Sequence, residues 1–512
     1  MKTNILKYTL SLLVLVVMAF GCTKDFDEIN TDPNRPKEVP TVNLISTAQR
    51  YITDDIFDEW FSARQGLLWS QFWAQRNYTE EDRFIIRQNV NNQYWRLLYT
   101  DMMDLQDIIN IASNPDRRAE INTYYGDADG QIAVANILKS YVFQLLVSTY
   151  GDVPYEEAFD AVNNPTPAYS TQKVIFLDLF AKLKAAADYL EGSTTTVFTS
   201  GDLMYDGDPA QWAKFANSLR LKLAIRLSKA TDPDLVAART AAIAEASDNV
   251  FTSNADNAGV TYLGDGESNS PMYDGFYVAR RNDFTVTANF VDLLKGINDT
   301  LNNKTNPFFG IEDPRLPIFV PKRGGAYRGM PYGIVNQNAS ALRSVTADLY
   351  NSQNLVAHAD ATVVWMDYAE VCFILSELNG WSQSWYEAGV AASLERWGAE
   401  GAADFIAALP AANEENVLTQ KYIALYMNGY EAWAEYRRTG YPKSIIEVGE
   451  KTGPLSNGTV VTFGPVPTTG NDRIPRRLTY PVQEFTINKE NADAASASVG
   501  GDTYNTKLIW DK

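Results

Sequence analysis

The sequence predicts a mainly α-helical protein in which neighbouring helices pair, with long loop-rich insertions and a few short β-hairpins. Three observations predict this fold class. Apolar residues recur at steps of three and four in several segments, helix-capping residues begin others, and residues 251–344 and 453–475 are instead rich in Gly, Asn, Asp and Pro. The pattern is one of helical hairpins and not of alternating strands and helices.

Four segments carry a single apolar stripe. The stripes lie at residues 98–112, 138–149, 368–378 and 418–433. In a helix, these spacings place the apolar side chains on one face, which is stable only when it is buried against another element. The stripes therefore predict helices that pack against one another.

Three more helices are predicted from their first residues. Asp208 and Asp232 each precede a proline, and an aspartate cap followed by proline in the first turn favours a helix start. Ser170 can cap a third helix in the same way. We therefore expect helices at residues 171–190, 209–228 and 233–246.

The N-terminus has the pattern of an export signal. Two lysines precede nine consecutive apolar residues, 12–20, which are too few to cross a bilayer as a helix. The run ends at Cys22 and a polar segment follows, which resembles a bacterial lipoprotein signal. We therefore expect a signal peptide at 1–21, lipidation of Cys22, and an acylated tether at 22–40 that anchors the protein to a membrane. The alternative is an ordinary secretory signal that is cut nearby.

Composition excludes several classes of function. The formal net charge is −19 and no basic cluster is longer than a pair, so nucleic acid is not an expected partner. Beyond residue 20, no apolar run approaches the length of a membrane-spanning helix. After lipidation of Cys22, only Cys372 remains as a thiol, so the chain cannot form an internal disulfide.

Histidine and cysteine, on which many catalytic sites depend, are rare in this chain. His358 is the only histidine and no nucleophile motif accompanies it, so we expect no Ser-His-Asp or Cys-His site. The chain has too few His and Cys residues for a zinc site built from them, and no phosphate-binding or dinucleotide motif is present. We therefore predict no catalytic residue, no metal and no cofactor. Carboxylates are plentiful, so a glycoside hydrolase that uses two of them stays open.

Aromatic residues are the informative class. The chain has 11 Trp, 28 Tyr and 23 Phe; such rings can stack on the C–H faces of sugars while Asn, Asp and Arg bind the hydroxyls. Two segments combine both kinds of residue. The predicted ligand-binding residues are Trp73, Asn77, Tyr78 and Arg83 in the first segment and Tyr273, Tyr277, Arg281 and Asp283 in the second. The alternatives are that Trp73, four residues after Trp69, is a core residue and that the second segment is a structural hairpin.

Motifs in order along the chain resemble those of the SusD/RagB family of Bacteroidetes lipoproteins. They are Asn30–Asn34, Gly151–Tyr155, Glu312–Leu316, Tyr368–Glu377, Gln420–Pro442 and Ile474–Pro481. The resemblance implies tetratricopeptide-like helix pairs that form a superhelical scaffold, here over residues 41–512. It also implies a protein that is lipid-anchored in the outer membrane and faces the cell exterior. Such a protein binds a nutrient, usually an oligosaccharide and sometimes a peptide, and delivers it to a SusC-like TonB-dependent transporter.

Charged residues inside these motifs have a structural interpretation. Glu370 lies within an apolar helix pattern, and a carboxylate on a packed helix needs a cation or backbone donors. The Arg437–Arg438 pair offers guanidinium groups that can bind carboxylates in this way. We therefore expect these residues to hold the fold together and not to act in catalysis.

Three functional hypotheses follow. The first is a surface glycan-binding lipoprotein that is not an enzyme, the second is an oligopeptide-binding member of the same family, and the third is a lipoprotein glycoside hydrolase. The family resemblance favours the first two. Stacking aromatics with amide and acidic neighbours favour sugars over peptides.

Overall fold

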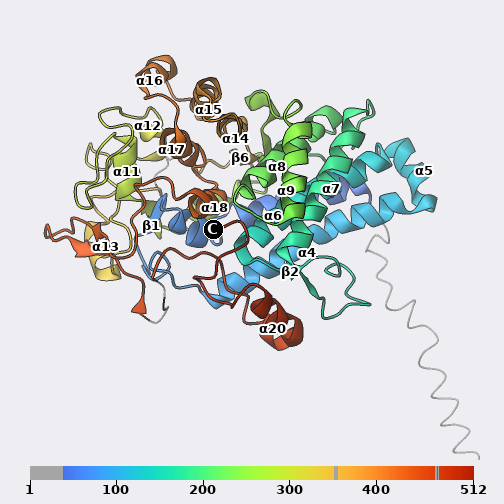
Figure 1. Ribbon diagram of the computed structural model, residues 1–512, viewed down its shortest axis with the longest axis horizontal. Helices are drawn as coiled ribbons and strands as arrows, with labels where there is room; N and C mark the ends of the chain where they lie inside the picture. Colours follow the sequence, from blue (N-terminus) through green and yellow to red (C-terminus); the bar gives the residue numbers. More distant parts are fainter. Residues whose placement is uncertain (1–38, 351–355, 468–469, 471, 512) are drawn as a thin grey trace, which may run out of the picture.

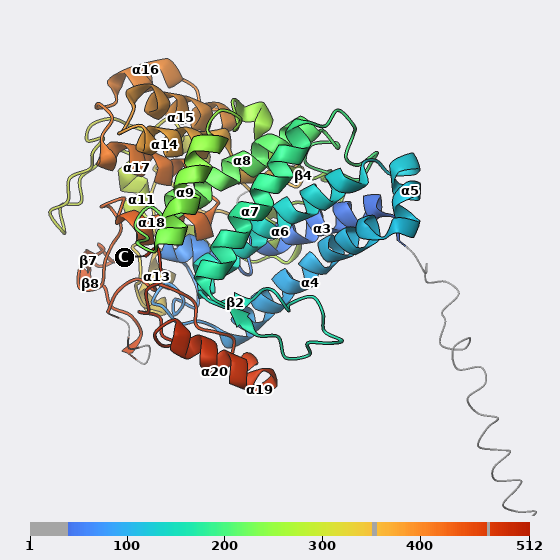
Figure 2. The same cartoon turned by 45° about the vertical axis from the view of Figure 1, so that its right-hand side comes forward.

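The computed structural model describes residues 39–350, 356–467, 470 and 472–511. The predicted signal peptide, lipidated Cys22 and most of the tether lie outside the described residues. The described part is mainly helical, as predicted (Figures 1 and 2). Its longer helices are α3 (Thr41–Ile56), α4 (Gln88–Ser113), α5 (Pro115–Tyr124), α6 (Ala128–Tyr150), α7 (Gln172–Glu191), α8 (Pro209–Arg226), α9 (Pro233–Ala246), α14 (Tyr368–Leu378), α15 (Gln383–Arg396), α17 (Glu414–Ala424), α18 (Gly429–Thr439) and α20 (Lys489–Ser498).

Short elements fill the loop-rich segments. The short α-helices are α10 (Pro271–Tyr273), α11 (Ala288–Leu294), α12 (Leu316–Phe319), α13 (Asn336–Leu342), α16 (Ala402–Ala408) and α19 (Glu484–Ile487). Other helical turns are η1 (Ala63–Leu67), η2 (Asn254–Asp256) and η3 (Asp274–Val278). Of these elements, η2, η3 and α10 to α13 lie in the Gly- and Pro-rich region 251–344.

The strands form four antiparallel pairs. They are β1 (Trp73–Gln75) with β5 (Phe284–Val286), β2 (Val153–Pro154) with β3 (Tyr169–Ser170), β4 (Ala258–Thr261) with β6 (Thr362–Met366), and β7 (Lys451–Thr452) with β8 (Val461–Thr462). Only β7 and β8 are joined by a short connection, as in the predicted hairpins. The pairs β1–β5 and β4–β6 instead join segments that are far apart in the sequence.

Two groups of helices pack against each other. In the first, α3, α4, α6, α7, α8 and α9 lie side by side, and Figure 2 shows α4, α6, α7, α8 and α9 as one array. In the second, α14 packs on α15 and α17 and also contacts α8. The first group and parts of α14 and α17 share one extensive apolar core, while α15 packs with α14 and α17 around a smaller one.

The predicted helix starts are close to the observed ones. The carboxylates of Asp208 and Asp232 cap α8 and α9 by accepting backbone N–H groups, as expected. At α7 the prediction of Ser170 is wrong by one residue, because the hydroxyl of Thr171 accepts the N–H of Val174. Ser170 instead belongs to strand β3.

The apolar stripe at residues 418–433 is not one helix. It is divided between α17 and α18, and Met427 between them has a φ of 75°. Gly429 begins α18 directly against Gly66 of η1, and a Cβ on Gly429 would come within 2.4 Å of the Gly66 carbonyl carbon. The close contact between two backbones requires glycine and sets where the second helix starts.

Helix α6 is the one helix in the described part of the chain that is long and apolar enough to cross a membrane. In the structure, 83% of its most apolar stretch of 18 residues is buried inside the protein. Its neighbours α4, α7 and α8 cover it. Helix α6 therefore has the surroundings of a core helix.

A buried cluster of charges joins both groups of helices. It consists of Lys222 and Arg226 on α8, Glu370 and Glu377 on α14, Lys421 on α17, and Glu431, Glu435 and Arg438 on α18. Glu370 lies 3.2 Å from the Nζ of Lys222, and Arg438 holds Glu377 with two hydrogen bonds of 2.7 and 2.8 Å. Arg437 donates to the carbonyls of Ser148 and Arg476. The structural interpretation of these charged residues is thus confirmed.

Candidate functional site

Strands β1 and β5 bring the two predicted binding segments together. Trp73 pairs with Val286 and Gln75 with Phe284, and the N–H of Arg76 donates to the carbonyl of Asp283 at 2.6 Å. The loop that leaves β1 and the loop that enters β5 therefore lie side by side. Their meeting point is on the side of the molecule that carries β1 and α13, opposite α5 (Figure 1).

Three tyrosines form a continuous aromatic group at this point, which we call the tyrosine surface: Tyr273, Tyr277 and Tyr350. The ring centres of Tyr273 and Tyr277 are 5.0 Å apart, and those of Tyr277 and Tyr350 are 5.4 Å apart. All three side chains are half-buried. Partial burial and the neighbouring Tyr350 raise the pKa of Tyr277, so its hydroxyl stays protonated and can donate a hydrogen bond.

The local sequence explains why these rings face outward. Tyr273 precedes the turn η3 and Tyr277 lies within it, while Phe276 of the same turn points inward and packs on Trp73 with ring centres 5.8 Å apart. Gly275 lies against Glu59, and a Cβ at this position would come within 2.5 Å of the Glu59 Cβ. A glycine and an inward phenylalanine thus fix the turn that presents the two tyrosines.

Polar side chains lie next to the tyrosine surface. Arg281 forms a 2.9 Å salt bridge with Asp283 and lies 5.7 Å from the centre of the Trp60 ring. Asn77 donates to Asp283 at 3.1 Å. Asp283 itself is only 6% exposed, so it positions Arg281 and Asn77 from below. Arg281 offers donors to a ligand, and Asn77, whose amide N–H groups bond to Asn282 and Asp283, offers its Oδ1 as an acceptor.

Tyr78 and Arg83 have different neighbours. Tyr78 is 56% exposed, its N–H donates to the side chain of Asn336, and Arg87 lies 5.9 Å from its ring centre. Arg83 is half-buried and donates from Nε to the carbonyl of Thr79. These contacts place the two residues on the β1 side of the loop pair, with the Tyr78 ring available to a ligand.

The prediction of Trp73 as a ligand-binding residue is corrected by the structure. Its side chain is fully buried, and its Nε1 donates to the hydroxyl of Tyr426 at 3.0 Å. It also lies in strand β1 and not on a helix with Trp69. Trp73 is a core residue that supports the turn of the tyrosine surface.

Sequence reasoning missed two aromatic members of this region. Trp60 is half-buried under two guanidinium groups, those of Arg64 at 4.4 Å and Arg281 at 5.7 Å. Tyr350 comes from a segment that the sequence did not single out. It is held near Tyr277 by Asp348, which accepts the Tyr350 N–H and pairs with Arg76 at 2.9 Å. No local pattern marks either residue, because both reach the site through tertiary contacts.

Two carboxylates lie beneath the site, and a glycoside hydrolase acts through such a pair. Burial raises the pKa of Glu59 to about 7, although Arg64 and Arg281 oppose the shift. Glu59 and Asp283 both approach Arg281, at 4.0 and 2.9 Å. A carboxyl with a raised pKa near a second carboxyl is typical of a glycosidase acid and its partner. Both side chains are less than 10% exposed, however, so in this structure neither meets a substrate.

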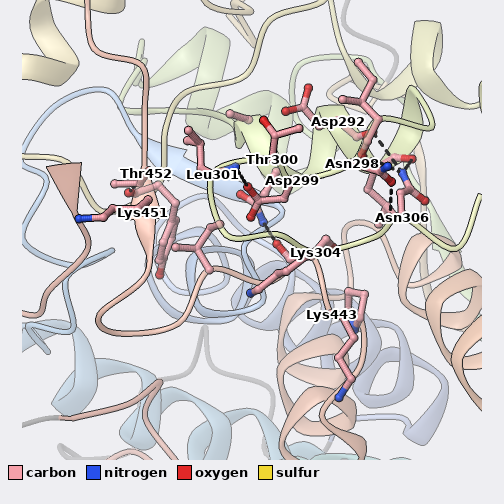
Figure 3. A pocket seen from close by; sticks show the side chains of 18 of the residues that line it. Asp292, Asn298, Asp299, Thr300, Leu301, Lys304, Asn306, Lys443, Lys451 and Thr452 are labelled. Atoms are coloured by element: carbon pink, nitrogen blue, oxygen red, sulfur yellow. Dashed lines mark hydrogen bonds between the residues drawn. The ribbon is translucent and has the colours of Figure 1, made fainter. Parts of the chain in front are cut away.

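A cavity of about 280 Å³ lies at the other end of β5, where α11 begins (Figure 3). Asp292, Asn298 and Asn306 line it from one segment, and Lys443 and Thr452 from the C-terminal loops. Asn298 accepts the N–H of Asn306 at 2.8 Å, so this side is held rigid. Burial raises the pKa of Asp292. The cavity combines hydroxyl, amide and apolar groups and has the size for a single small polar molecule.

The described residues contain no group of three or more His, Cys, Asp or Glu side chains placed to hold a metal ion. Within the described residues, Cys372 is a buried free thiol whose pKa is raised by burial to about 12. A thiol of this kind is inert at neutral pH. The rings and polar side chains of the tyrosine surface offer stacking and hydrogen bonding.

The comparison with known families identifies the protein family of this chain. Residues 33–481 match the family model SusD-like, described as "Starch-binding associating with outer membrane". The chain belongs to this SusD/RagB family. No curated protein matches the sequence.

Solved structures share the fold over nearly the whole chain. A SusD homologue from Parabacteroides distasonis has a TM-score of 0.74 at 23% identity, over 92% of this chain and 98% of that one. A chitin-binding SusD homologue from Flavobacterium johnsoniae has a TM-score of 0.70 at 22% identity, over 92% and 97%. A further chitin-binding protein has a TM-score of 0.72 at 24% identity, over 92% and 100%. At these identities the likeness establishes the fold.

Proposed function

We propose that this protein is a glycan-binding lipoprotein of the cell surface that captures an oligosaccharide on the tyrosine surface. The observation that carries the proposal is the β1–β5 pairing, which joins two aromatic and polar loops into one site. In this proposal Tyr273, Tyr277 and Tyr350 stack on sugar rings. Arg281 and Asn77 bind hydroxyls, and the residues Tyr78 and Arg83 extend the site along the neighbouring loop.

Sugar chemistry suits these groups. A pyranose ring presents axial C–H groups that pack on an aromatic face. Pairs of aromatic rings contribute about 0.5–1.5 kcal/mol beyond their buried area, and we take this range as the scale for a sugar on a tyrosine. Three rings in a row can follow successive sugar units of one chain. The family's starch-binding description and the chitin-binding relatives support a glycan as the ligand.

The proposal includes an anchor and a partner. Cys22 carries the lipid that holds the protein at the outer membrane, facing outward, and the bound glycan passes to a SusC-like TonB-dependent transporter. The sequence pattern around Cys22 and membership of an outer-membrane-associated family support both parts. In this role the protein binds its ligand and leaves it chemically unchanged.

A glycan and peptide array with the soluble form lacking residues 1–22 tests the proposal. We expect oligosaccharides to bind and Tyr277→Ala to weaken that binding at least about fivefold, which corresponds to about 1 kcal/mol. Tyr78→Ala tests the extension of the site. Tyr124→Ala is the matched control, because Tyr124 is 68% exposed and ends α5, on the opposite side of the molecule (Figure 1).

The array also separates the remaining hypotheses. Binding of peptides alone, lost in Tyr277→Ala, would make the chain an oligopeptide-binding member of the family. Normal glycan binding by Tyr277→Ala with a lowered melting temperature would mean that the tyrosines only pack. In that case the cavity at the start of α11 becomes the next candidate site.

A further inference from the structure

A second pocket lies among the paired helices, away from the tyrosine surface. It has a volume of about 970 Å³ and lies where the loop after β2 covers α4, α6 and α7. Figure 2 shows these three helices side by side with β2 at one end. We call it the lysine pocket; its lining includes Gln106, Asn110, Lys139, Tyr155, Phe159 and Lys182.

Lys139 of α6 is the unusual residue in this pocket. Its side chain donates to Gln106 at 2.5 Å, and its Nζ lies 4.0 Å from the centre of the Phe159 ring. It is only 9% exposed, yet no carboxylate of the described residues lies within 4 Å of it. The other buried lysines, Lys222 and Lys421, both pair with glutamates.

The carboxylates that share the pocket have other partners. Asp178 pairs with Lys182 at 2.7 Å and accepts the hydroxyl of Tyr155 at 2.5 Å. Glu156 accepts the hydroxyl of Ser170 at 3.2 Å. Asp160 accepts the side-chain amide of Asn163. Lys139 therefore lacks the counter-charge that a buried ammonium normally has.

This isolation has an electrostatic consequence. Burial, helped by the nearby Lys182, lowers the pKa of Lys139 from 10.5 to about 7. An anion placed beside the amine would favour the ammonium form and raise the pKa again. Binding of an anion would therefore draw a proton from the solvent at neutral and mildly alkaline pH.

We propose that the lysine pocket binds a small molecule with a carboxylate, of the class of acidic monosaccharides, whose carboxylate pairs with Lys139 and whose ring packs on Phe159. Gln106 accepts the Lys139 amine and donates to Asn110 Oδ1 at 2.9 Å, which leaves the side-chain N–H groups of Asn110 for the ligand's hydroxyls. The pocket volume is at the upper end of the range for small-molecule sites, about 300–1,000 Å³. This site is independent of the tyrosine surface and does not rest on the proposed function.

Calorimetry tests the proposal, with glucuronate, galacturonate and N-acetylneuraminate as probes and glucose and galactose as neutral controls. At about pH 8, in buffers of different ionisation enthalpy, we expect at least one acid to bind with uptake of up to about 0.9 proton per ligand. The neutral sugars should bind at least about tenfold more weakly at this site.

Two substitutions at Lys139 separate charge from proton uptake. Lys139→Met should lose at least about tenfold in affinity for the acid while it melts no lower than the parent, because it removes a buried amine that has no counter-charge. Lys139→Arg carries a permanent charge and should bind the acid without proton uptake. Lys184→Met is the matched control, because Lys184 is an exposed lysine of α7 outside the pocket.

Several results of these measurements would overturn the acid-binding proposal. If none of the three acids binds in the millimolar range, or if Lys139→Met binds them as well as the parent, the pocket is not an acid-binding site. Equal binding of the acids and the neutral sugars would also overturn the proposal. Acid binding without proton uptake by the parent would remove Lys139 from the role of counter-charge.

Discussion

Replacing Lys222 by methionine should destabilise the fold, because it removes the salt-bridge partner of a buried carboxylate, Glu370. The Nζ of Lys222 lies 3.2 Å from Glu370 and 3.1 Å from Glu431, and all three side chains are at most 5% exposed. Glu431 keeps its salt bridge with Arg226. Glu370 would keep no salt-bridge partner in the described part of the chain, so it carries the cost.

The magnitude follows from this geometry. Removing one partner of a buried ion pair costs about 3–5 kcal/mol in the free energy of unfolding, because an unpaired charge stays buried. Glu370 can lower the cost by taking up a proton. Burial already raises its pKa to about 7 while Lys222 opposes the shift. We therefore expect a loss near the lower end, about 3 kcal/mol at neutral pH.

The pH dependence identifies the cause. A carboxyl whose pKa is raised in the folded state contributes stability below its unfolded pKa, and that contribution is lost as pH rises through its folded pKa. Removing Lys222 raises the folded pKa of Glu370 further. Above pH 7 the gap between the parent and Lys222→Met should therefore widen by about 1.4 kcal/mol per pH unit until that new pKa is reached.

Urea unfolding of the form lacking residues 1–22 at pH 5, 7 and 8.5 measures these quantities. Adding Glu370→Leu to Lys222→Met should recover most of the loss, because both charges are then gone. Lys184→Met is the control, since Lys184 pairs with Asp188 on the surface and should change stability by less than about 0.5 kcal/mol. A double variant as unstable as the single one, or a gap that is constant with pH, would refute the reasoning.

Three further predictions concern the anchor, the acidic contact of α3 with α4, and catalysis. Cys22→Ser should give a folded protein without fatty-acid label or membrane retention; a labelled, membrane-bound variant would exclude lipidation at this residue. Burial and the neighbouring Asp55 raise the pKa of Asp101 to about 9. Between about pH 4 and pH 9 the folded state therefore holds a proton that the unfolded state has lost. The stability of the parent should fall as pH rises through this range. Asp101→Asn should therefore gain stability over the parent as pH rises in denaturant titrations, and a constant difference would contradict the assignment. The purified protein should release no reducing ends from a carbohydrate panel; release that Glu59→Gln abolishes would instead establish a hydrolase.

Local chemistry made much of the helical scaffold predictable. Asp208 and Asp232 cap α8 and α9 within their own first turns, so residues two or three positions away determine the outcome. The break between α17 and α18 depends instead on Gly66, more than 350 residues earlier, which meets Gly429 backbone to backbone. Periodicity within one segment carries no information about such a contact.

The same difference between local and long-range contacts explains which residues of the site could be predicted. The sequence picked out Tyr277 and Arg281 because aromatic and polar residues cluster there, and both side chains are partly exposed. It gave Trp73 the same role, but Trp73 pairs with Val286 in a strand whose partner lies more than 200 residues away. Tyr350 was missed because its place beside Tyr277 depends on the Arg76–Asp348 salt bridge.

Buried charges beneath the tyrosine surface give it the rigidity that a binding site needs. Arg64 is held by Glu81 at 2.6 Å and lies against Trp60. Asp283, itself buried, fixes Arg281 by a salt bridge and Asn77 by a hydrogen bond. Side chains that are already ordered lose little conformational entropy when a ligand binds, so more of the contact energy appears as affinity. The loops of this site are therefore irregular in sequence but preorganised in structure, as the proposed capture of a glycan on the tyrosine surface requires.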